Sequence, residues 1–518
     1  MKRLVTVLLT LLAFGLMPRS HAQVSVLTYH NDNSRTGVNT NETILTPANV
    51  SSNIFKRLFT RSVDGYVYAQ PLVAAGVNLP RVGSRNVVYV ATEHDSLYAF
   101  DAISGRSYWH KKLLPKRGKT VSSVKDANCT DLIPEIGVTS TPVIDPATST
   151  IYVVEKGKTN TVFFQRLHAL DLATGAEKFG GPVSLTASTP GSGDGNISGT
   201  VSYDPLRQHQ RSGLLLVNGV VYIASAAHCD IGPYHGWILG YNATNLAQVT
   251  AFNTTPNGGL GGVWMSGCGP SADASGNVYA STGNGTFDVD TGGSDYGSSV
   301  IEFNAGSGLT VADYFTPFDQ ASLSASDTDL GSGGVLLLPD QPGPNTHLAI
   351  TAGKAGTVYV LNRDNLGHFQ NGSDSQIVQS LPGAIGSTFC TPAWFNGNIY
   401  YSGSDDTLKE FALNSGLLSA NPVSQSASNI GFPGATPSIS ANGTSNAIVW
   451  IIQTDSYTNR NGQAILHAYD ATDLTRELYN STTSRQPPGL AVKFAVPTVA
   501  NGKVYVGAVR HLAVYGLH

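Results

Sequence analysis

The stretch Val87-Val88-Tyr89-Val90, followed by Leu97-Tyr98-Ala99-Phe100-Asp101, contains the pattern that decides the fold. Apolar residues dominate both halves and a short polar turn separates them, which predicts two antiparallel strands of one sheet. The pattern returns at the end of the chain as Lys503-Val504-Tyr505-Val506 and Leu512-Ala513-Val514-Tyr515. Repetition of this kind is a better guide to domain organisation than length, so we expect a chain built from repeats of one β unit.

Eight copies of the second strand can be followed along the chain. They begin at Leu97, Leu167, Ile238, Val300, Val358, Leu408, Leu466 and Leu512. Many units also carry a proline that opens an apolar segment upstream of the first strand. These prolines are Pro71, Pro142, Pro270, Pro392, Pro437 and Pro497.

Each unit therefore reads as a blade of three or four short antiparallel strands, and no long helical periodicity follows the first residues. Eight such blades in series predict an all-β, eight-bladed β-propeller, because radial closure leaves only short, protected sheet edges. The last unit stops after its middle strands, so we expect the segment from Phe55 to Val63 to supply its outer strand and close the ring. Two smaller propellers are the weaker alternative, since no linker interrupts the series.

The first 22 residues resemble a secretory signal peptide, with Lys2 and Arg3 ahead of an apolar run from Leu4 to Met17. Ser20-His21-Ala22 supplies small residues at a cleavage site. The run is shorter than the ~20 residues that a membrane span needs. We predict export to the periplasm or the medium, no membrane span, and a mature propeller domain over residues 23–518.

The charge balance argues against nucleic-acid binding. The chain has 31 Lys and Arg against 35 Asp and Glu, and the predicted leader carries three of the basic residues and no acid. A mildly acidic protein lacks the basic surface that nucleic acids or anionic membranes require.

Four cysteines remain, Cys129, Cys229, Cys268 and Cys390, and three pairings are open to them in an oxidising compartment. No Cys-x-x-Cys occurs, which argues against a zinc site. No Cys-x-x-Cys-His occurs either, so no covalently attached haem is expected.

The repeat resembles that of the quinoprotein alcohol dehydrogenase-like propellers, the superfamily of pyrroloquinoline quinone (PQQ) repeats. The resemblance rests on Leu-x-Ala-x-Asp-x-x-x-Gly before an aromatic residue, as in the stretches from Leu97 to Trp109 and from Leu167 to Phe179. It also rests on Leu45-Thr46-Pro47-Ala48-Asn49-Val50 and Gln70-Pro71-Leu72-Val73. More narrowly, the chain is similar to secreted bacterial PQQ-like repeat proteins. The resemblance implies a quinone on the ring axis, stacked on a tryptophan, with calcium and a catalytic aspartate beside it.

The resemblance implies three residues at the metal, and two of them lie on either side of the loop between residues 284 and 295. Thr282-Gly283-Asn284 matches the family segment whose asparagine oxygen binds calcium, a cation that takes oxygen ligands. Asp295, just upstream of the strand at Val300, matches the catalytic aspartate that takes the alcohol proton and contacts the metal, with Asp288 and Asp290 as competitors. A turn asparagine and a solvated loop acid are the structural alternatives.

Three further residues follow from the same resemblance. Trp264 matches the tryptophan under the quinone, and Lys354 matches the basic residue that contacts the quinone oxygens. Asp230 matches the acidic calcium ligand, with a shift of one position. A tryptophan packed between blades and a solvated turn lysine are the alternatives for the first two. The loop with His228, Cys229 and His235 would also suit a transition metal, a rim of hydrogen bonds or a disulfide.

One departure bears on the function. Many family dehydrogenases carry two adjacent cysteines over the quinone, whereas this chain has Thr92-Glu93-His94-Asp95 in that region. The leading hypotheses are a PQQ- and calcium-dependent dehydrogenase of alcohols or sugars that needs an external electron acceptor, and a non-catalytic propeller that binds a protein or polymer. A hydrolase or lyase using the same axial pocket is a third. The first requires Trp264, Asn284, Asp295 and Lys354 to meet in one axial pocket that takes a small-molecule or polymer ligand.

Overall fold

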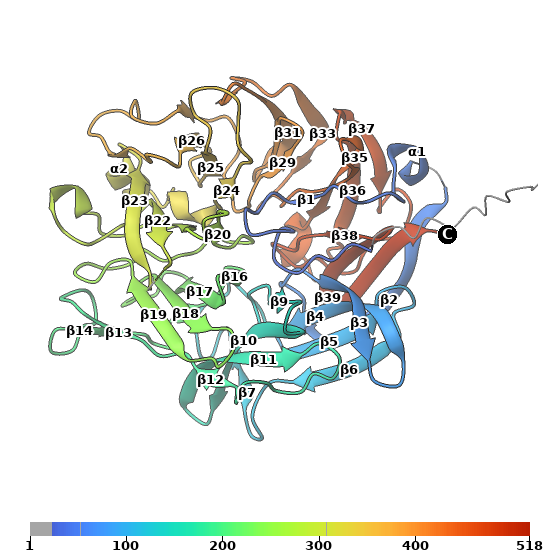
Figure 1. Ribbon diagram of the computed structural model, residues 1–518, viewed down its shortest axis with the longest axis horizontal. Coiled ribbons are helices and arrows are strands. Elements are labelled where there is room, and N and C mark those ends of the chain that lie inside the picture. The colour runs from blue at the N-terminus through green and yellow to red at the C-terminus, as the bar shows by residue number, and fades with distance from the viewer. Residues whose placement is uncertain (1–22, 52, 307) are drawn as a thin grey trace, which may run out of the picture.

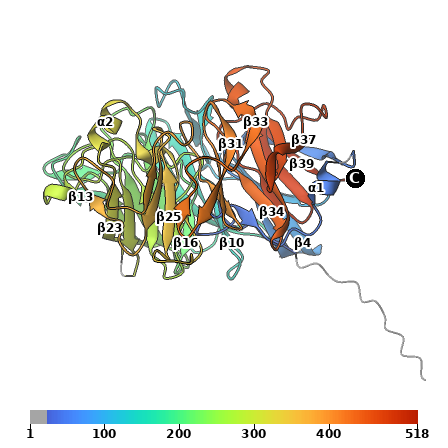
Figure 2. The same ribbon diagram turned by 90° about the horizontal axis from the view of Figure 1, so that it is seen from above.

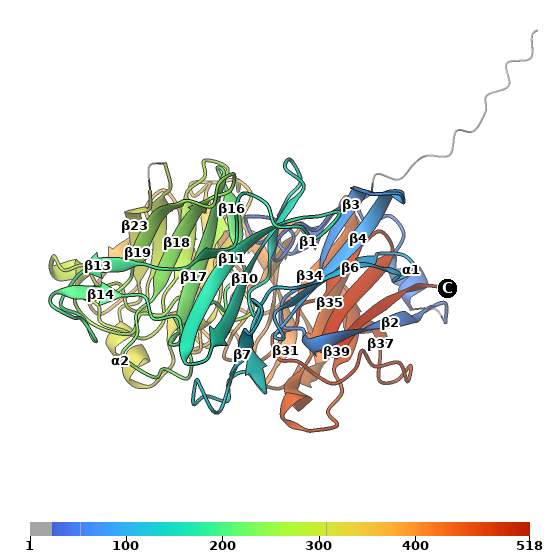
Figure 3. The same cartoon turned by 90° about the horizontal axis from the view of Figure 1, so that it is seen from below.

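The computed structural model describes residues 23–518 except 52 and 307, so the predicted signal peptide lies outside the described residues and stays a prediction. The described chain forms sheets around a common centre (Figure 1), an eight-bladed β-propeller. Figures 2 and 3 show these sheets standing side by side around the ring. The predicted fold class is confirmed, and we number the blades 1 to 8 in chain order.

Each blade opens with a short strand, and in six blades the predicted proline directly precedes it. Proline lacks an N–H and suits the position before a strand, where no ladder hydrogen bond is needed. The first strands of blades 1 to 8 are β3 (Leu72–Leu79), β9 (Val143–Asp145), β16 (Leu215–Val217), β20 (Ser271–Ala272), β24 (Leu336–Leu337), β29 (Ala393–Phe395), β34 (Ser438–Asn442) and β38 (Thr498–Ala500).

The second and third strands are the antiparallel pair that the sequence predicts. In blade 1, Tyr89 lies opposite Ala99. The second strands are β4 (Gly83–Thr92), β10 (Thr150–Thr159), β17 (Val220–Ala227), β21 (Val278–Ser281), β25 (Leu348–Ala352), β30 (Asn398–Ser402), β35 (Ser445–Gln453) and the first part of β39 (Lys503–Leu517). The third strands are β5 (Ser96–Asp101), β11 (Val162–Asp171), β18 (Trp237–Asn242), β22 (Val300–Asn304), β26 (Val358–Asn362), β31 (Asp406–Asn414), β36 (Ile465–Asp470) and the last part of β39.

The repeated tyrosine and aspartate have separate tasks. Tyr89 Oη donates a 2.8 Å hydrogen bond to the Leu172 carbonyl of the next blade, and Tyr505 Oη donates one of 2.9 Å to Ala102. Asp101 Oδ1 instead accepts the backbone N–H of Ser104 at 2.7 Å and so fixes the turn after the third strand. The tyrosine joins neighbouring blades, whereas the aspartate shapes its own blade.

The outer strands include one from the other end of the chain. β2 (Phe55–Tyr66) pairs antiparallel with β39, with Phe55 opposite Leu517, so the predicted closure by the segment from Phe55 to Val63 is confirmed (Figure 1). The other outer strands are β6 (Ser107–Lys112), β12 (Val183–Ser184), β19 (Gln248–Asn253), β23 (Thr310–Thr316), β28 (Gln379–Leu381), β33 (Ser424–Ile430) and β37 (Asp473–Asn480).

Short additional strands and helices extend the blades. Two of these strands pair in parallel with blade strands: β1 with β34, and β27 with β23. The added strands are β1 (Val38–Asn39), β7 (Lys119–Ser122), β8 (Glu135–Ile136), β13 (Ser188–Pro190), β14 (Thr200–Ser202), β15 (Gln208–His209), β27 (His368–Phe369) and β32 (Leu417–Leu418). The helices are α1 (Pro47–Val50), α2 (Gln320–Ala325), η1 (Val289–Thr291), η2 (Leu330–Ser332) and η3 (Asp455–Thr458). No helix of the described chain has the length and apolar character needed to cross a membrane.

The hydrophobic core is divided among the interfaces between blades. Blades 1 and 2 share one cluster, in which Val87 and Ile151 are fully buried. Blades 8 and 1 share another, which includes Tyr505 and Val88. Because the last blade packs on the first as the others pack on their neighbours, the ring is closed by apolar burial as well as by strand pairing.

A segment that the repeat does not predict crosses the ring centre. Residues 26–39, which we call the strap, hydrogen-bond to the first strand of every blade. Val26 N donates to Val73 in blade 1 at 2.8 Å, and Asn39 Nδ2 donates to Val499 in blade 8 at 3.1 Å. The intermediate partners are Ile144, Leu216, Ala272, Leu337, Trp394 and Ile439. The strap therefore occupies one end of the ring axis.

Candidate functional site

A cavity of about 360 Å³ lies at the other end of the axis, and we call it the axial pocket. Its wall includes Asp131 from blade 2, Lys354 from blade 5 and Phe494 from the start of blade 8. Loops so widely separated around a ring can meet only at its centre. Arg211 and Phe494 also line a second cavity of about 20 Å³ that reaches Tyr29 of the strap, so this pair separates the pocket from the plugged end.

Two aspartates and a lysine dominate one part of the wall. Lys354 Nζ lies 2.5 Å from Asp327 Oδ1 and 2.8 Å from Asp329 Oδ1. The Asp329 side chain is 2% exposed, and burial raises its pKa against the opposing effect of Lys354. Burial alone would lower the pKa of Lys354, but the two carboxylates raise it overall, so the lysine is a cation here.

Asn284 joins the same group through its side chain. Its Nδ2 donates a 2.8 Å hydrogen bond to Asp327 Oδ1. Its Oδ1 is buried and has no hydrogen-bond partner among the described residues. Asn284 follows β21 and Gly283. A Cβ at position 283 would lie 2.7 Å from both Asp329 and Trp264, so only glycine lets the backbone pass this close to them.

Trp264 also lines the pocket. Its indole lies nearly perpendicular to the ring of Tyr234, with the ring centroids 6.5 Å apart, and this edge-to-face geometry is a favourable aromatic contact. The indole is partly exposed and offers apolar surface to a flat ligand beside the charged group of Asp327, Asp329 and Lys354.

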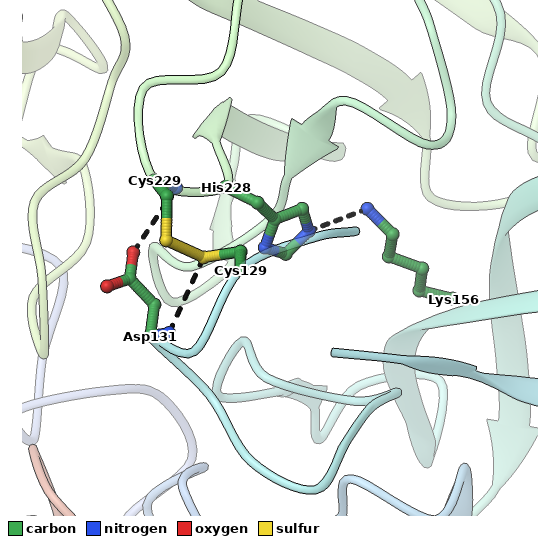
Figure 4. Close-up of a disulfide and its surroundings, with 5 residues drawn as sticks. All are labelled: Cys129, Asp131, Lys156, His228 and Cys229. Atoms are coloured by element: carbon green, nitrogen blue, oxygen red, sulfur yellow. Dashed lines mark hydrogen bonds between the residues drawn. A yellow bond between two sulfur atoms is a disulfide. The ribbon is translucent and has the colours of Figure 1, made fainter. Parts of the chain in front are cut away.

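Asp230 lines the pocket next to a disulfide. Its Oδ1 accepts a 2.5 Å hydrogen bond from Tyr234 Oη, and burial raises its pKa. Cys229 forms a disulfide with Cys129 (Figure 4), whereas Cys268 and Cys390 are buried free thiols. Cys229 also lines the pocket, so a disulfide between distant cysteines forms part of the wall, although adjacent cysteines are absent.

The structure does not bring Asp295 to the pocket. Asp295 is 1% exposed, and its Oδ1 accepts a 3.0 Å hydrogen bond from the backbone N–H of Asn257. Its position is that of a turn-forming acid, and Asp327 and Asp329 lie beside Lys354 and Asn284 instead. No signal in the sequence marked these two. In the structure they lie just before Gly331, where the backbone approaches Thr282 too closely to leave room for a side chain.

The alternative transition-metal site is not assembled. Both ring nitrogens of His235 are already hydrogen-bonded: Nδ1 lies 2.9 Å from the Thr255 carbonyl oxygen and Nε2 lies 2.8 Å from that of Asp194. His228 Nε2 bonds to Lys156 Nζ at 2.8 Å (Figure 4). Among the described residues, three His, Cys, Asp or Glu ligand atoms lie within 4.8 Å of one another only at Cys129, Asp131 and Cys229, where the cysteines are disulfide-bonded.

The oxygens of the pocket suit a hard cation such as calcium. Asn284 Oδ1 and Asp329 Oδ2 are buried and lack hydrogen bonds among the described residues, which is costly unless a ligand satisfies them. Amide and carboxylate oxygens are the ligands that calcium takes. Asn284, Asp329 and Asp230 would hold such an ion, and Lys354 would compete with it for the carboxylate of Asp329.

No protein-family model and no curated protein matches the chain. Solved structures do. The quinohemoprotein alcohol dehydrogenase ADHIIG from Pseudomonas putida HK5 is 16% identical over 95% of this chain and 80% of that chain, with a TM-score of 0.60. The quinohemoprotein alcohol dehydrogenase from Comamonas testosteroni is 15% identical over 96% of this chain and 81% of that chain, with a TM-score of 0.62. A europium-containing methanol dehydrogenase is 13% identical over 95% of this chain and 98% of that chain, also with a TM-score of 0.62. At such identities the likeness shows the fold alone, a propeller of the quinoprotein dehydrogenase type.

Proposed function

We propose that this protein is an exported dehydrogenase of alcohols or sugars that uses PQQ and a hard cation such as calcium. One observation carries the proposal: Trp264, Asp327, Asp329 and Lys354, with Asn284 beside them, surround a single axial cavity. The names of the three similar structures, two quinohemoprotein alcohol dehydrogenases and a methanol dehydrogenase containing a lanthanide, support it.

The base in this proposal is Asp327. Its side chain is 67% exposed, and Oδ1 is held by Lys354 and Asn284, whereas Oδ2 has no hydrogen bond among the described residues. Oδ2 is therefore placed to take the hydroxyl proton of a substrate. Lys354 would stabilise the negative charge that develops on the quinone oxygens, and Trp264 would supply a flat apolar surface for the quinone ring to stack on. A bound quinone would accept the two electrons of the substrate C–H bond while a bound cation polarised the oxygen.

Export and electron transfer complete the proposal. The leader-like first residues support a location in the periplasm or outside the cell. Without a Cys-x-x-Cys-His motif for covalent haem, electrons would leave to a separate acceptor.

Reconstitution tests the proposal. The mature protein is mixed with PQQ and with calcium or a lanthanide, and quinone absorbance and dye reduction are followed with a panel of alcohols and sugars. We expect tight PQQ binding and dye reduction with at least one substrate. Binding without turnover on any substrate would leave only a ligand-binding propeller, and no binding of PQQ at all would exclude the quinoprotein assignment.

A further inference from the structure

Two cations of the axial pocket, Arg211 and Lys493, form neither hydrogen bonds nor ion pairs with the residues that the structure describes. Arg211 is 9% exposed and Lys493 is 5% exposed, and both line the cavity. A buried cation that is neither paired nor hydrogen-bonded is costly, so each needs an explanation.

Other buried cations of this molecule are satisfied. The guanidinium of Arg35, which is fully buried, donates to carbonyls of Pro270, Tyr29 and Leu214 at 2.9, 2.8 and 3.2 Å. The ammonium of Lys156 donates to the carbonyls of Leu206 and Gln208 at 2.8 and 2.7 Å. Arg211 and Lys493 depart from this pattern, and both face the cavity.

Aromatic rings surround the two cations. Arg211 lies over the ring of Phe494 at 3.9 Å, and Lys493 Nζ lies 5.1 Å from the ring of Tyr457 and 5.9 Å from that of Phe432. Cation–π contacts offset part of the lost hydration but use none of the N–H donors. Aromatic rings beside the N–H donors of Arg211 and Lys493 also provide an apolar surface on which a flat organic molecule could stack.

The surrounding charge indicates what kind of anion fits. The pocket wall carries the cations Arg211, Lys354 and Lys493 and the acids Asp131, Asp230, Asp327 and Asp329. Asp131 attracts both Arg211 and Lys493 electrostatically, but it forms an ion pair within 4.0 Å with neither. A highly charged phosphate or sulfate would meet this acidic wall, whereas a planar carboxylate matches the guanidinium fork with a single charge.

We infer that Arg211 and Lys493 form a carboxylate-binding subsite of the axial pocket, which takes the acid group of a flat organic molecule against Phe494. The inference shares the pocket with the proposed function but does not require dehydrogenase chemistry. The carboxylate has two sources: an acid group of the quinone, or an acid group of the substrate, which would then be a hydroxy acid or an acidic sugar.

Calorimetry on the mature full-length protein tests the subsite with benzoate and its neutral isostere benzamide. Arg211→Gln and Lys493→Met remove the cations, and Arg363→Gln, which removes an arginine outside the pocket, is the control. We expect wild type and the control to bind benzoate about tenfold or more tightly than benzamide, and each pocket variant to lose that difference. Equal affinities in wild type, no detectable benzoate binding at millimolar concentration, or folded variants that keep the preference would each overturn the inference.

A second arm separates the sources and is independent of turnover. PQQ is titrated into the same variants with calcium present. A loss of PQQ affinity of about tenfold assigns the subsite to the quinone. If Arg211→Gln loses the preference for benzoate but keeps its affinity for PQQ, the subsite belongs to the substrate. If wild type binds benzoate but not PQQ, the subsite stands and the proposed function fails.

Discussion

Lys354 Nζ lies 2.8 Å from Oδ1 of Asp329, a carboxylate that is almost completely buried at the ring axis. Removing one partner of such a pair leaves the other as an uncompensated buried charge. The pair therefore makes a prediction about stability that is separate from any activity.

Lys354→Met should lower the free energy of unfolding by about 3–5 kcal/mol at neutral pH. The double variant Lys354→Met/Asp329→Asn should recover part of the loss, because the unpaired charge is gone. Urea unfolding measures both, and Lys409→Met is the control, because the carboxylate of its partner Asp406 is more exposed than that of Asp329. A double variant no more stable than the single one would show that the pair is not coupled.

Asp327→Asn should reduce turnover of the reconstituted enzyme by about 10²–10⁴-fold, because the amide cannot take the hydroxyl proton. PQQ affinity should change little, since Trp264 and Lys354 remain. Asp295→Asn is the matched comparison, because that carboxylate serves the Asn257 backbone outside the pocket. Steady-state dye reduction compares the two, and a larger loss in Asp295→Asn would reverse the assignment of the base.

The blades were predictable because their signals are local. The tyrosine and aspartate of each repeat act within one hairpin or on the next blade, so the pattern around Tyr89 and Asp101 recurs wherever the geometry does. The strap was not predictable, because residues 26–39 have no period of their own. Their hydrogen bonds go to first strands that the sequence spreads over the whole chain.

The site residues were also predictable only in part. Lys354 lies in the short turn between β25 and β26 of one repeat, and Trp264 was chosen by resemblance although it lies in the connection between β19 and β20; both line the pocket. Asp327 and Asp329 were missed because they lie in the irregular connection between β23 and β24, whose path no repeat dictates. Asp295 was chosen for its position before β22, but the adjoining turn uses its carboxylate.

Gly37→Ala should destabilise the ring through the strap. Gly37 has φ +70°, and a Cβ there would lie 2.2 Å from Nε2 of His30, whose ring bridges Arg35 and Pro437. We expect a loss of about 2–4 kcal/mol from the strained backbone and the clash. Gly83→Ala is the control, because Gly83 has φ +82° with open space around it and should show only the backbone cost. Equal losses in thermal unfolding would mean that His30 moves aside freely.

Cys129→Ser/Cys229→Ser should cost about 2–5 kcal/mol, because the bond ties positions 100 residues apart. Reducing agent should weaken the wild type and leave the double variant unchanged. Cys390→Ser is the control, since Cys390 is a free buried thiol. A reducing agent that destabilises all three proteins equally would show that the disulfide is not the group responsible.

Lys493 makes stability depend on alkaline pH. Burial, with repulsion from Arg211 and against attraction by Asp131, lowers the pKa of Lys493 to about 8 from an ordinary value of 10.5. Between these two values the unfolded chain holds the proton more firmly than the folded one, so stability should rise with pH across that window and be level below it. The slope belonging to Lys493 is at most about 1.4 kcal/mol per pH unit.

Lys493→Met should remove that rise while leaving the effects of other groups in place. The measurement is the difference in free energy of unfolding between wild type and Lys493→Met at several pH values from 7 to 10. We expect wild type to gain on the variant as the pH passes about 8. Saturating benzoate should move the onset upward, because a carboxylate beside Lys493 favours the charged form. A difference that stays constant with pH would mean that Lys493 is paired and would remove the reason to expect an anion beside it.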